Sequence, residues 1–327
     1  MCKKYFSIDF QVLSTVECDM FIDIAANLTD DMFQGTYHEK KRHESDLELV
    51  IERAKNAHCD KMIVLAGTLE DAHKCLEICN TFDPAGGCLY TTVGFHPTRC
   101  GEAAKIVGDA SDEEAEKIIH EIFRQFIEKA GKGRVVAIGE FGLDYDRLNF
   151  CPIEVQKRFF EIQLRVATNH FPDHPLLLHL RNAFDDFVDI ISKHNVQGVV
   201  HSFTGSNTEM RKLVDLGLYI GINGCSLRDA WDVVPHIPED RLIIETDSPY
   251  CEIKPTHPAH PFLSGPEIPE RVKPEKFVLG SFVKSRNEPA CINQVAFALA
   301  KVRRVDFGSL SATIRANTIR LFRALAK

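Results

Sequence analysis

Histidines and carboxylates that can bind a divalent metal stand at the ends of several apolar runs in this sequence. The runs VVAIGE, PLLLH, GVVH and LIIETD end at Glu140, His179, His201 and Asp247, and the run TVGFHP contains His96. One such residue could be a hydrogen-bonded boundary position or a helix cap. Burying two carboxylates among apolar runs is costly unless a metal or a basic group compensates their charge. The combined pattern therefore indicates a metal site.

Two carboxylates and two imidazoles form a mixed set of metal ligands. Oxygen ligands suit magnesium or manganese, whereas imidazole suits zinc and other transition metals. Glu140 could bridge two ions through its two oxygens, an arrangement that suits phosphodiester hydrolysis because both ions neutralise the developing charge. Asp247 could bind metal and also accept the proton of the attacking water. We therefore expect a hydrolase with two divalent cations, magnesium or manganese, with zinc as the alternative.

Buried strands must bring these residues to one edge of a sheet. Eight short apolar runs are rich in β-branched and aromatic residues, which is typical of parallel strands covered on both faces. These runs are Phe21–Leu28, Lys61–Gly67, Leu89–His96, Val135–Glu140, Pro175–Arg181, Gly198–Phe203, Leu218–Gly224 and Arg241–Asp247.

Amphipathic segments separate the predicted strands. In the first of them, Leu47, Val50, Ile51 and Ala54 follow the spacing of one helix face. Strands alternating with helices predict an α/β fold, a (β/α)8 TIM-type barrel. A doubly wound open sheet is the alternative, but it would gather its site at one topological switch point. The barrel is favoured because ligand-type residues end strands along the whole chain.

The sequence predicts one barrel domain over residues 21–327, preceded by an N-terminal extension of residues 1–20. The segment Glu252–Pro289 follows the eighth strand and carries six prolines between Pro255 and Pro274, so we expect an extended loop. Such a loop should lie over the C-terminal mouth of the barrel. Two helices are predicted after it, at Glu288–Val302 and Leu310–Ala326.

Charge and cysteine usage narrow the classes of protein that the chain can belong to. A formal net charge of −8 argues against a surface that coats DNA broadly. Eleven cysteines, an odd number without any CxxC pair, indicate reduced thiols rather than a disulfide framework. No apolar run reaches the ~18 residues of a membrane span. We expect a cytoplasmic or nuclear protein that is neither secreted nor in a membrane.

The apolar runs and the residues that end them resemble TatD-type deoxyribonucleases, a branch of the metal-dependent hydrolases built on a distorted TIM barrel. The eukaryotic TatD subgroup is the most similar. The resemblance covers about Met20 to Lys327 and preserves the order of the motifs, which here are FIDIAANLTD, TVGFHPTRCGE, VVAIGEFGLDYDR, LLLHLRNA, VVHSFTG, LYIGINGCSL, LIIETDSPY and RNEPA.

The resemblance implies roles for the candidate site residues. Glu140 would bridge two divalent ions, with His179 and His201 on one ion and Asp247 on the other. His96 would lie near the scissile phosphate. Arg181 could hold a phosphate oxygen; the alternative is that it forms a salt bridge to a loop carboxylate. Asp144 and Glu245 could orient the metal ligands.

The chain departs from the family's pattern at the first strand. Many TatD relatives carry His-x-His there, whereas this chain has Ala25 and Asn27. Ala25 cannot bind a metal, and Asn27 offers only a neutral oxygen. Phe141 and Leu180 replace cysteines that are common beside the ligands, as packing substitutions.

The leading functional hypothesis is a metal-dependent deoxyribonuclease, a 3′-5′ exonuclease acting on single-stranded DNA or on 3′ ends. No obligate protein partner is implied. One alternative is an amide or ester hydrolase on the same barrel, since fold does not fix substrate. The other is a barrel without catalysis that serves as a binding protein, a hypothesis motivated by the missing His-x-His.

Overall fold

The computed structural model describes residues 20–263 and 270–326. The predicted N-terminal extension lies outside these residues except for Met20, which is exposed. None of the described helices is both long and apolar enough to cross a lipid bilayer.

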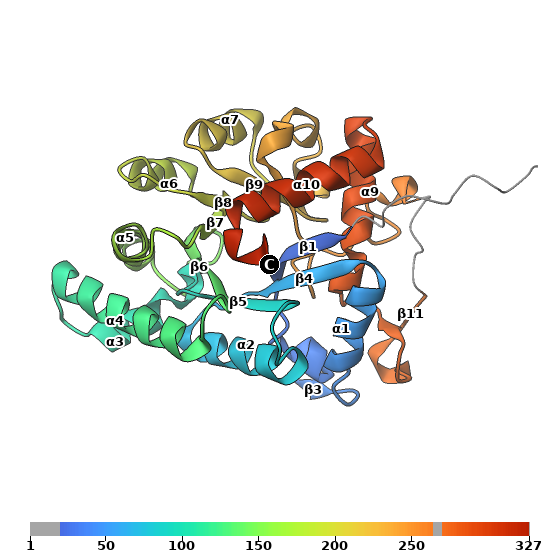
Figure 1. The fold of residues 1–327 in the computed structure, drawn as a ribbon, viewed down its shortest axis with the longest axis horizontal. Coiled ribbons are helices and arrows are strands. Elements are labelled where there is room, and N and C mark those ends of the chain that lie inside the picture. The colour runs from blue at the N-terminus through green and yellow to red at the C-terminus, as the bar shows by residue number, and fades with distance from the viewer. Residues whose placement is uncertain (1–19, 264–269, 327) are drawn as a thin grey trace, which may run out of the picture.

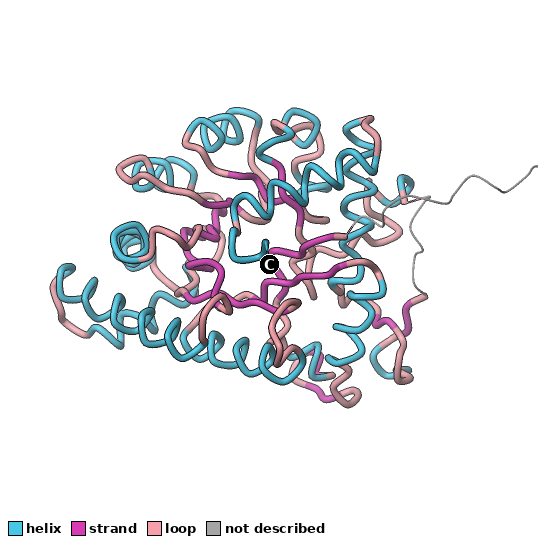
Figure 2. The backbone as a smooth tube through the Cα atoms, in the orientation of Figure 1, coloured by secondary structure: helices cyan, strands magenta, loops and turns pink. Residues whose placement is uncertain are grey.

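Eight parallel strands form a nearly closed barrel (Figure 2). Neighbouring strands follow the chain order, and the gap between the first and the last is bridged by Ala26 and Ser248. The predicted barrel is thus confirmed, with this irregular closure as its distortion. The strands are β1 (Phe21–Ala26), β4 (Cys59–Val64), β5 (Leu89–Val93), β6 (Val135–Asp144), β7 (Leu176–Arg181), β8 (Gly198–Val200), β9 (Tyr219–Ile222) and β10 (Leu242–Ile244).

Helices cover the outside of the ring of strands (Figure 1). The amphipathic stripe predicted for the first helix is buried as expected, and the N-terminus of α4 is fixed by a capping box of Ser111 and Glu114. The helices are α1 (Leu47–Asn56), α2 (Leu69–Phe82), α3 (Cys100–Val107), α4 (Asp112–Ala130), α5 (Ile153–His170), α6 (Phe184–Ile191), α7 (Asn207–Asp215), α8 (Ser226–Asp229), α9 (Ile292–Arg303) and α10 (Phe307–Leu321).

The apolar core has two parts, one between the strands and the helices and one inside the barrel. The inner part consists of strand residues such as Leu177, Val199 and Ile243. It is completed by Leu321, Phe322 and Leu325 from the C-terminal segment, which runs across the ring of strands in Figure 1. The C-terminal segment therefore closes one end of the barrel and leaves the opposite mouth for the site.

The segment after β10 is held by a fully buried ion-pair network in the RNEPA motif. Arg286 contacts Asp46 at 2.6 Å and Glu288 at 2.9 Å, and all three side chains are 0% exposed. Arg53 of α1 also pairs with Asp46 and Glu288. Buried charges persist only when paired and hydrogen-bonded, so this network ties the motif to α1.

The predicted extended segment Glu252–Pro289 lies only partly at the barrel mouth. Near its start, His257 Nε2 bonds the carbonyl of Gly224, which follows β9. Its later part packs against α1, where Arg53 bonds the carbonyl of Gly280. This part contains short strands and 3-10 turns at β11 (Arg271–Val272), β12 (Phe282–Val283) and Pro274–Lys276. A second small sheet pairs β2 (Thr36–Tyr37) with β3 (Lys40–Lys41).

Candidate metal centre

A β-bulge in β6 positions Glu140. In the pairing with β7, Gly139 faces Leu177 and Phe141 faces Leu178, so Glu140 is the extra residue between them. Bulges re-aim a side chain relative to the regular alternation of a strand. The sequence predicted that the strand ends at Glu140, but β6 continues to Asp144. Glu140 is therefore a bulge residue within a longer strand.

Close contact between β6 and β7 depends on Gly142. Gly142 pairs with His179, and a Cβ atom at this position would lie 2.0 Å from the His179 carbonyl oxygen. Only glycine permits this approach of the two backbones. The approach brings Glu140 beside His179.

The two-residue alternation of the strands places the remaining groups. Leu177, Val199 and Ile243 point into the inner core, so the residues two positions further along face the same interior. These residues are His179, His201 and Glu245, and the next step along β7 is Arg181.

One carboxylate oxygen of Glu140 is the centre of the site. Glu140 Oε1 lies 2.6 Å from His179 Nδ1 and 2.7 Å from His201 Nε2. These two nitrogens are 3.4 Å apart, and all three side chains are buried. Three ligand atoms thus converge on one small volume.

Each of these imidazoles has a second carboxylate on its other nitrogen. His179 Nε2 is 3.2 Å from Asp144 Oδ2, and His201 Nδ1 is 3.4 Å from Glu245 Oε1. Glu245 is itself held by the backbone N–H of Ser202 at 2.7 Å. Outer carboxylates of this kind fix the tautomer and orientation of metal-binding histidines. Asp144 makes a contact of this kind, whereas Glu245 lies beside His201 Nδ1 without hydrogen-bond geometry. The orienting role of both carboxylates stays a prediction.

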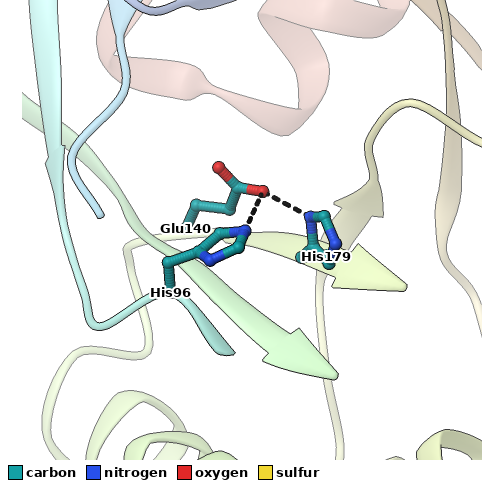
Figure 3. Close-up of side chains that lie close together, drawn as sticks. All are labelled: His96, Glu140 and His179. Atoms are coloured by element: carbon teal, nitrogen blue, oxygen red, sulfur yellow. Dashed lines mark hydrogen bonds and ion pairs between the residues drawn. The ribbon is translucent and has the colours of Figure 1, made fainter. Parts of the chain in front are cut away.

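His96 completes the group drawn in Figure 3. Its Nε2 is 3.5 Å from Glu140 Oε1. The backbone N–H of Thr98 donates to His96 Nδ1 at 3.2 Å, so the proton of the neutral ring is on Nε2. Ligand atoms of His96, Glu140 and His179 lie within 4.8 Å of one another. From the sequence we expected His96 to lie near the scissile phosphate. That it also lies close enough to Glu140 and His179 to bind the same metal ion was not predicted.

Burial and mutual charge shift the titration of the central groups. Burial raises the pKa of Glu140, but His201 and His96 outweigh it and hold this pKa well below its usual range. Burial lowers the pKa of His201, but Glu140 and Glu245 raise it well above its usual range. Both shifts favour the charged forms of Glu140 and His201. A divalent cation would take the place of the shared proton.

Asp247 lies in the same cavity but makes its own contacts. Asn27 Nδ2 donates to Asp247 Oδ1 at 2.9 Å, and the Cys251 thiol lies 3.5 Å from Asp247 Oδ2. Burial raises the pKa of Asp247 to about 6. The structure thus places Glu140, His179, His201 and His96 in contact and Asp247 separately beside them.

A cavity of about 460 Å³ opens over these groups. Arg181 and Arg147 line it, together with Tyr250. Among the described residues the guanidinium of Arg181 has no hydrogen bond or ion pair, and both expected roles of Arg181, a phosphate contact or a salt bridge to a loop carboxylate, stay predictions. The sequence also missed Arg147 and Tyr250, because nothing in their spacing links them to the strand ends.

The donor set fits divalent cations. Two imidazole nitrogens and a carboxylate oxygen meet within 3.4 Å of one another, and imidazole with carboxylate suits several divalent metals. A parallel barrel with such donors at its mouth is the architecture of a metal-dependent hydrolase.

Comparison with known proteins identifies the family. The family model described as TatD related DNase matches residues 22–323. The chain is 39% identical to "Deoxyribonuclease Tat-D" of Schizosaccharomyces pombe, over 92% of this chain and 95% of that protein. The chain therefore belongs to the TatD-related DNase family.

Two further relatives support the assignment. A "3'-5' ssDNA/RNA exonuclease TatD" of Pectobacterium parmentieri is 29% identical, over 92% of this chain and 98% of that protein. The crystal structure of an uncharacterized amidohydrolase from Saccharomyces cerevisiae superposes with a TM-score of 0.84 at 32% identity, covering 93% of this chain and 99% of that chain. The chain is a metal-dependent hydrolase homologous to these enzymes.

Proposed function

We propose that this protein is a metal-dependent 3′-5′ exodeoxyribonuclease that acts on single-stranded DNA or on free 3′ ends. The observation that carries the proposal is the convergence of His179 and His201 on one oxygen of Glu140, beneath a cavity lined by arginines. The Pectobacterium relative, named as a 3'-5' ssDNA/RNA exonuclease, supports the polarity and the single-stranded substrate.

Four residues would hold two divalent cations, magnesium or manganese, with zinc as the alternative. Glu140 would bridge them, His179 and His201 would bind one, and Asp247 the other. When bound, such cations neutralise phosphate charge and lower the pKa of the attacking water. Asp144 and Glu245 keep the ligand nitrogens of the two histidines directed at Glu140.

The protein's own groups position the phosphate and move the proton. The Asp247 carboxylate accepts the proton of the attacking water. His96 donates from Nε2 to a non-bridging phosphate oxygen, and Arg181 holds another. The bond between phosphorus and the 3′-oxygen breaks, which leaves a 3′-hydroxyl on the strand, protonated from solvent, and a 5′-phosphate on the released nucleotide.

The cavity and the charge of the protein suit a strand end better than a duplex. About 460 Å³ lies within the range of ~300–1,000 Å³ typical of ligand pockets. With a net charge of −8 the protein lacks the broad positive field of duplex-coating proteins. The nine described cysteines are free thiols, which supports our expectation of the cytoplasm or nucleus.

The test is nucleotide release from a 5′-labelled single-stranded oligonucleotide. We expect a ladder that shortens from the 3′ end with magnesium or manganese, no reaction with chelator, and loss of reaction in Glu140→Gln. The surface substitution Glu128→Gln is the matched control. If wild-type protein hydrolyses no DNA with any divalent ion tested, the proposal is wrong.

An amide or ester hydrolase is the second candidate, because one similar structure is described as an amidohydrolase. Assays of small esters and amides beside DNA separate the two. Activity on the esters that exceeds activity on DNA would favour this candidate. A third hypothesis, a non-catalytic binding protein, requires that wild type and Glu140→Ala contain the same amount of metal.

A further inference from the structure

A second cavity adjoins the catalytic one. It measures about 650 Å³ and is formed by the start of α6, the loop after β8 and the short helix α8. Two residues, Arg181 and Cys225, line both cavities. A ligand can therefore extend from the metal centre past Arg181 into the second cavity.

Arg181 is the one guanidinium of the second cavity without a bonded partner among the described residues. Arg228 also lines the cavity, but it forms two bonds with the neighbouring Asp229, at 2.7 and 2.9 Å. Arg181 is half-buried and makes no such contact. The charge of Arg181 also acts on Asp144 and Asp229, but a guanidinium without a hydrogen bond at the junction of two cavities is suited to hold a single phosphate group between them.

The rest of the second cavity does not suit further phosphates. Its charged lining consists of two arginines and four carboxylates, so its net charge is negative. Carboxylate and amide oxygens can instead accept hydrogen bonds from the amino groups of a nucleobase. Phe184, half-buried against the apolar core at the start of α6, also lines this cavity, and bases stack on aromatic side chains regardless of sequence.

The rim of the second cavity is open to the surface, whereas the catalytic cavity ends on buried groups. Asn182, Asp185 and Arg228 are exposed, but Glu140, His179 and His201 are at most 7% exposed. A strand end can therefore stop at the metal centre while the rest of the strand leaves through the second cavity.

We propose that the second cavity is the subsite for the penultimate nucleoside of the DNA strand, the one whose 3′-oxygen leaves. This inference rests on the proposed exonuclease function. Arg181 holds the scissile phosphate at the junction, and Phe184 stacks on the penultimate base. Because that base must be free to enter the cavity, an unpaired 3′ end is required.

The test compares a minimal substrate with an oligonucleotide. Thymidine 5′-(methyl phosphate) supplies the terminal nucleoside with a leaving group that carries no ring, and a trinucleotide also fills the second cavity. We expect Phe184→Leu, which keeps an apolar side chain but removes the ring, to lower the kcat/KM for the trinucleotide relative to that for the ester by about tenfold. Phe184→Tyr should restore the ratio.

A trinucleotide with an abasic penultimate position isolates the stacking contact. Measured against a penultimate thymine, which has no amino group to donate to the lining carboxylates, it should lose about the same tenfold in wild type. In Phe184→Leu it should lose nothing further, since both changes remove the same stacking contact. Phe150→Ala, at an exposed phenylalanine that lines neither cavity, is the control. The proposed subsite would be overturned if Phe184→Leu lowered kcat/KM equally for the ester and the trinucleotide. It would also be overturned if the losses from Phe184→Leu and from the abasic substrate were additive. Failure of wild type on both substrates would overturn the nuclease proposal along with it.

Discussion

The side-chain amide of Asn27 donates a hydrogen bond to Asp247 over 2.9 Å, joining the first strand of the barrel to the residues after the last. Asn27 directly follows β1, where the resemblance to TatD-type enzymes led us to expect a His-x-His pattern. Here the same region supports the Asp247 carboxylate with a hydrogen bond, which favours the ionised form that a metal needs.

Removing this hydrogen bond should weaken metal binding in a pH-dependent way. The Asn27 bond lowers the pKa of Asp247, which burial raises to about 6. In Asn27→Ala this pKa rises further, so a larger fraction of Asp247 is protonated near neutral pH. We expect manganese affinity to fall by about tenfold at pH 6 and less at pH 8, measured by isothermal titration. An equal loss at both pH values would contradict this role; Asn169→Ala, an exposed position, is the control.

The outer carboxylate on His179 should matter for metal affinity. Asp144→Asn removes the charge beside His179 Nε2, and substitutions of such groups typically cost about 10–100-fold in metal affinity or activity. Asp146→Asn, two residues away and exposed, should change metal affinity little. Equal metal affinities in the two variants would show that Asp144 does not act through His179.

His96 distinguishes a substrate role from a ligand role. If it contacts the phosphate, His96→Ala should lower kcat by about 10²–10⁴-fold with unchanged metal content. Elemental analysis after gel filtration measures that content. Loss of one ion would instead make His96 a ligand, as its 3.5 Å distance to Glu140 also permits.

The buried network around Arg286 should dominate the stability of the RNEPA motif. Arg286→Ala leaves Asp46 and Glu288 buried without their central cation, and breaking a buried ion pair costs about 3–5 kcal/mol. Arg124 also pairs with two carboxylates, but at the surface, so Arg124→Ala should cost less than about 1 kcal/mol. Urea unfolding of the two variants gives the comparison. Similar losses would mean that α1 relaxes and admits water.

Asp23 should make unfolding pH-dependent. Burial raises its pKa from 3.8 to about 7, against hydrogen bonds from Thr246. Because the folded state favours the protonated carboxyl, the stability that this group contributes is complete below about pH 4 and is lost as the pH rises to 7. The shift of about 3 units corresponds to at most about 4 kcal/mol. In Asp23→Asn the free energy of unfolding should depend less on pH between pH 5 and 8. An unchanged pH dependence would show that other groups cause it.

The sequence predicted the elements and most of the site residues because buried parallel strands leave a strong local pattern. Apolar runs identify β7 and β8, and the polar residues that follow them are visible in the same run. The bulge at Glu140 left no such pattern, so the continuation of β6 to Asp144 was missed. The contact of Asn27 with Asp247 spans 220 positions and depends on closure of the barrel. The unpaired state of Arg181 likewise depends on where loops from other strands lie.

Closure of the barrel by Leu321, Phe322 and Leu325 has a consequence for how the chain folds. These residues share the inner core with Ile22 and Ile24 of β1, which lie almost the whole described chain away in sequence. Contacts of such sequence separation form slowly because the loop entropy is lost first. During synthesis on the ribosome the inner face of β1 therefore stays uncovered until the C-terminal segment has been made, nearly 300 residues later. A nascent chain that has already made every candidate metal ligand still lacks the segment that seals its barrel, so a competent metal centre should arise only after Leu325 has left the ribosome.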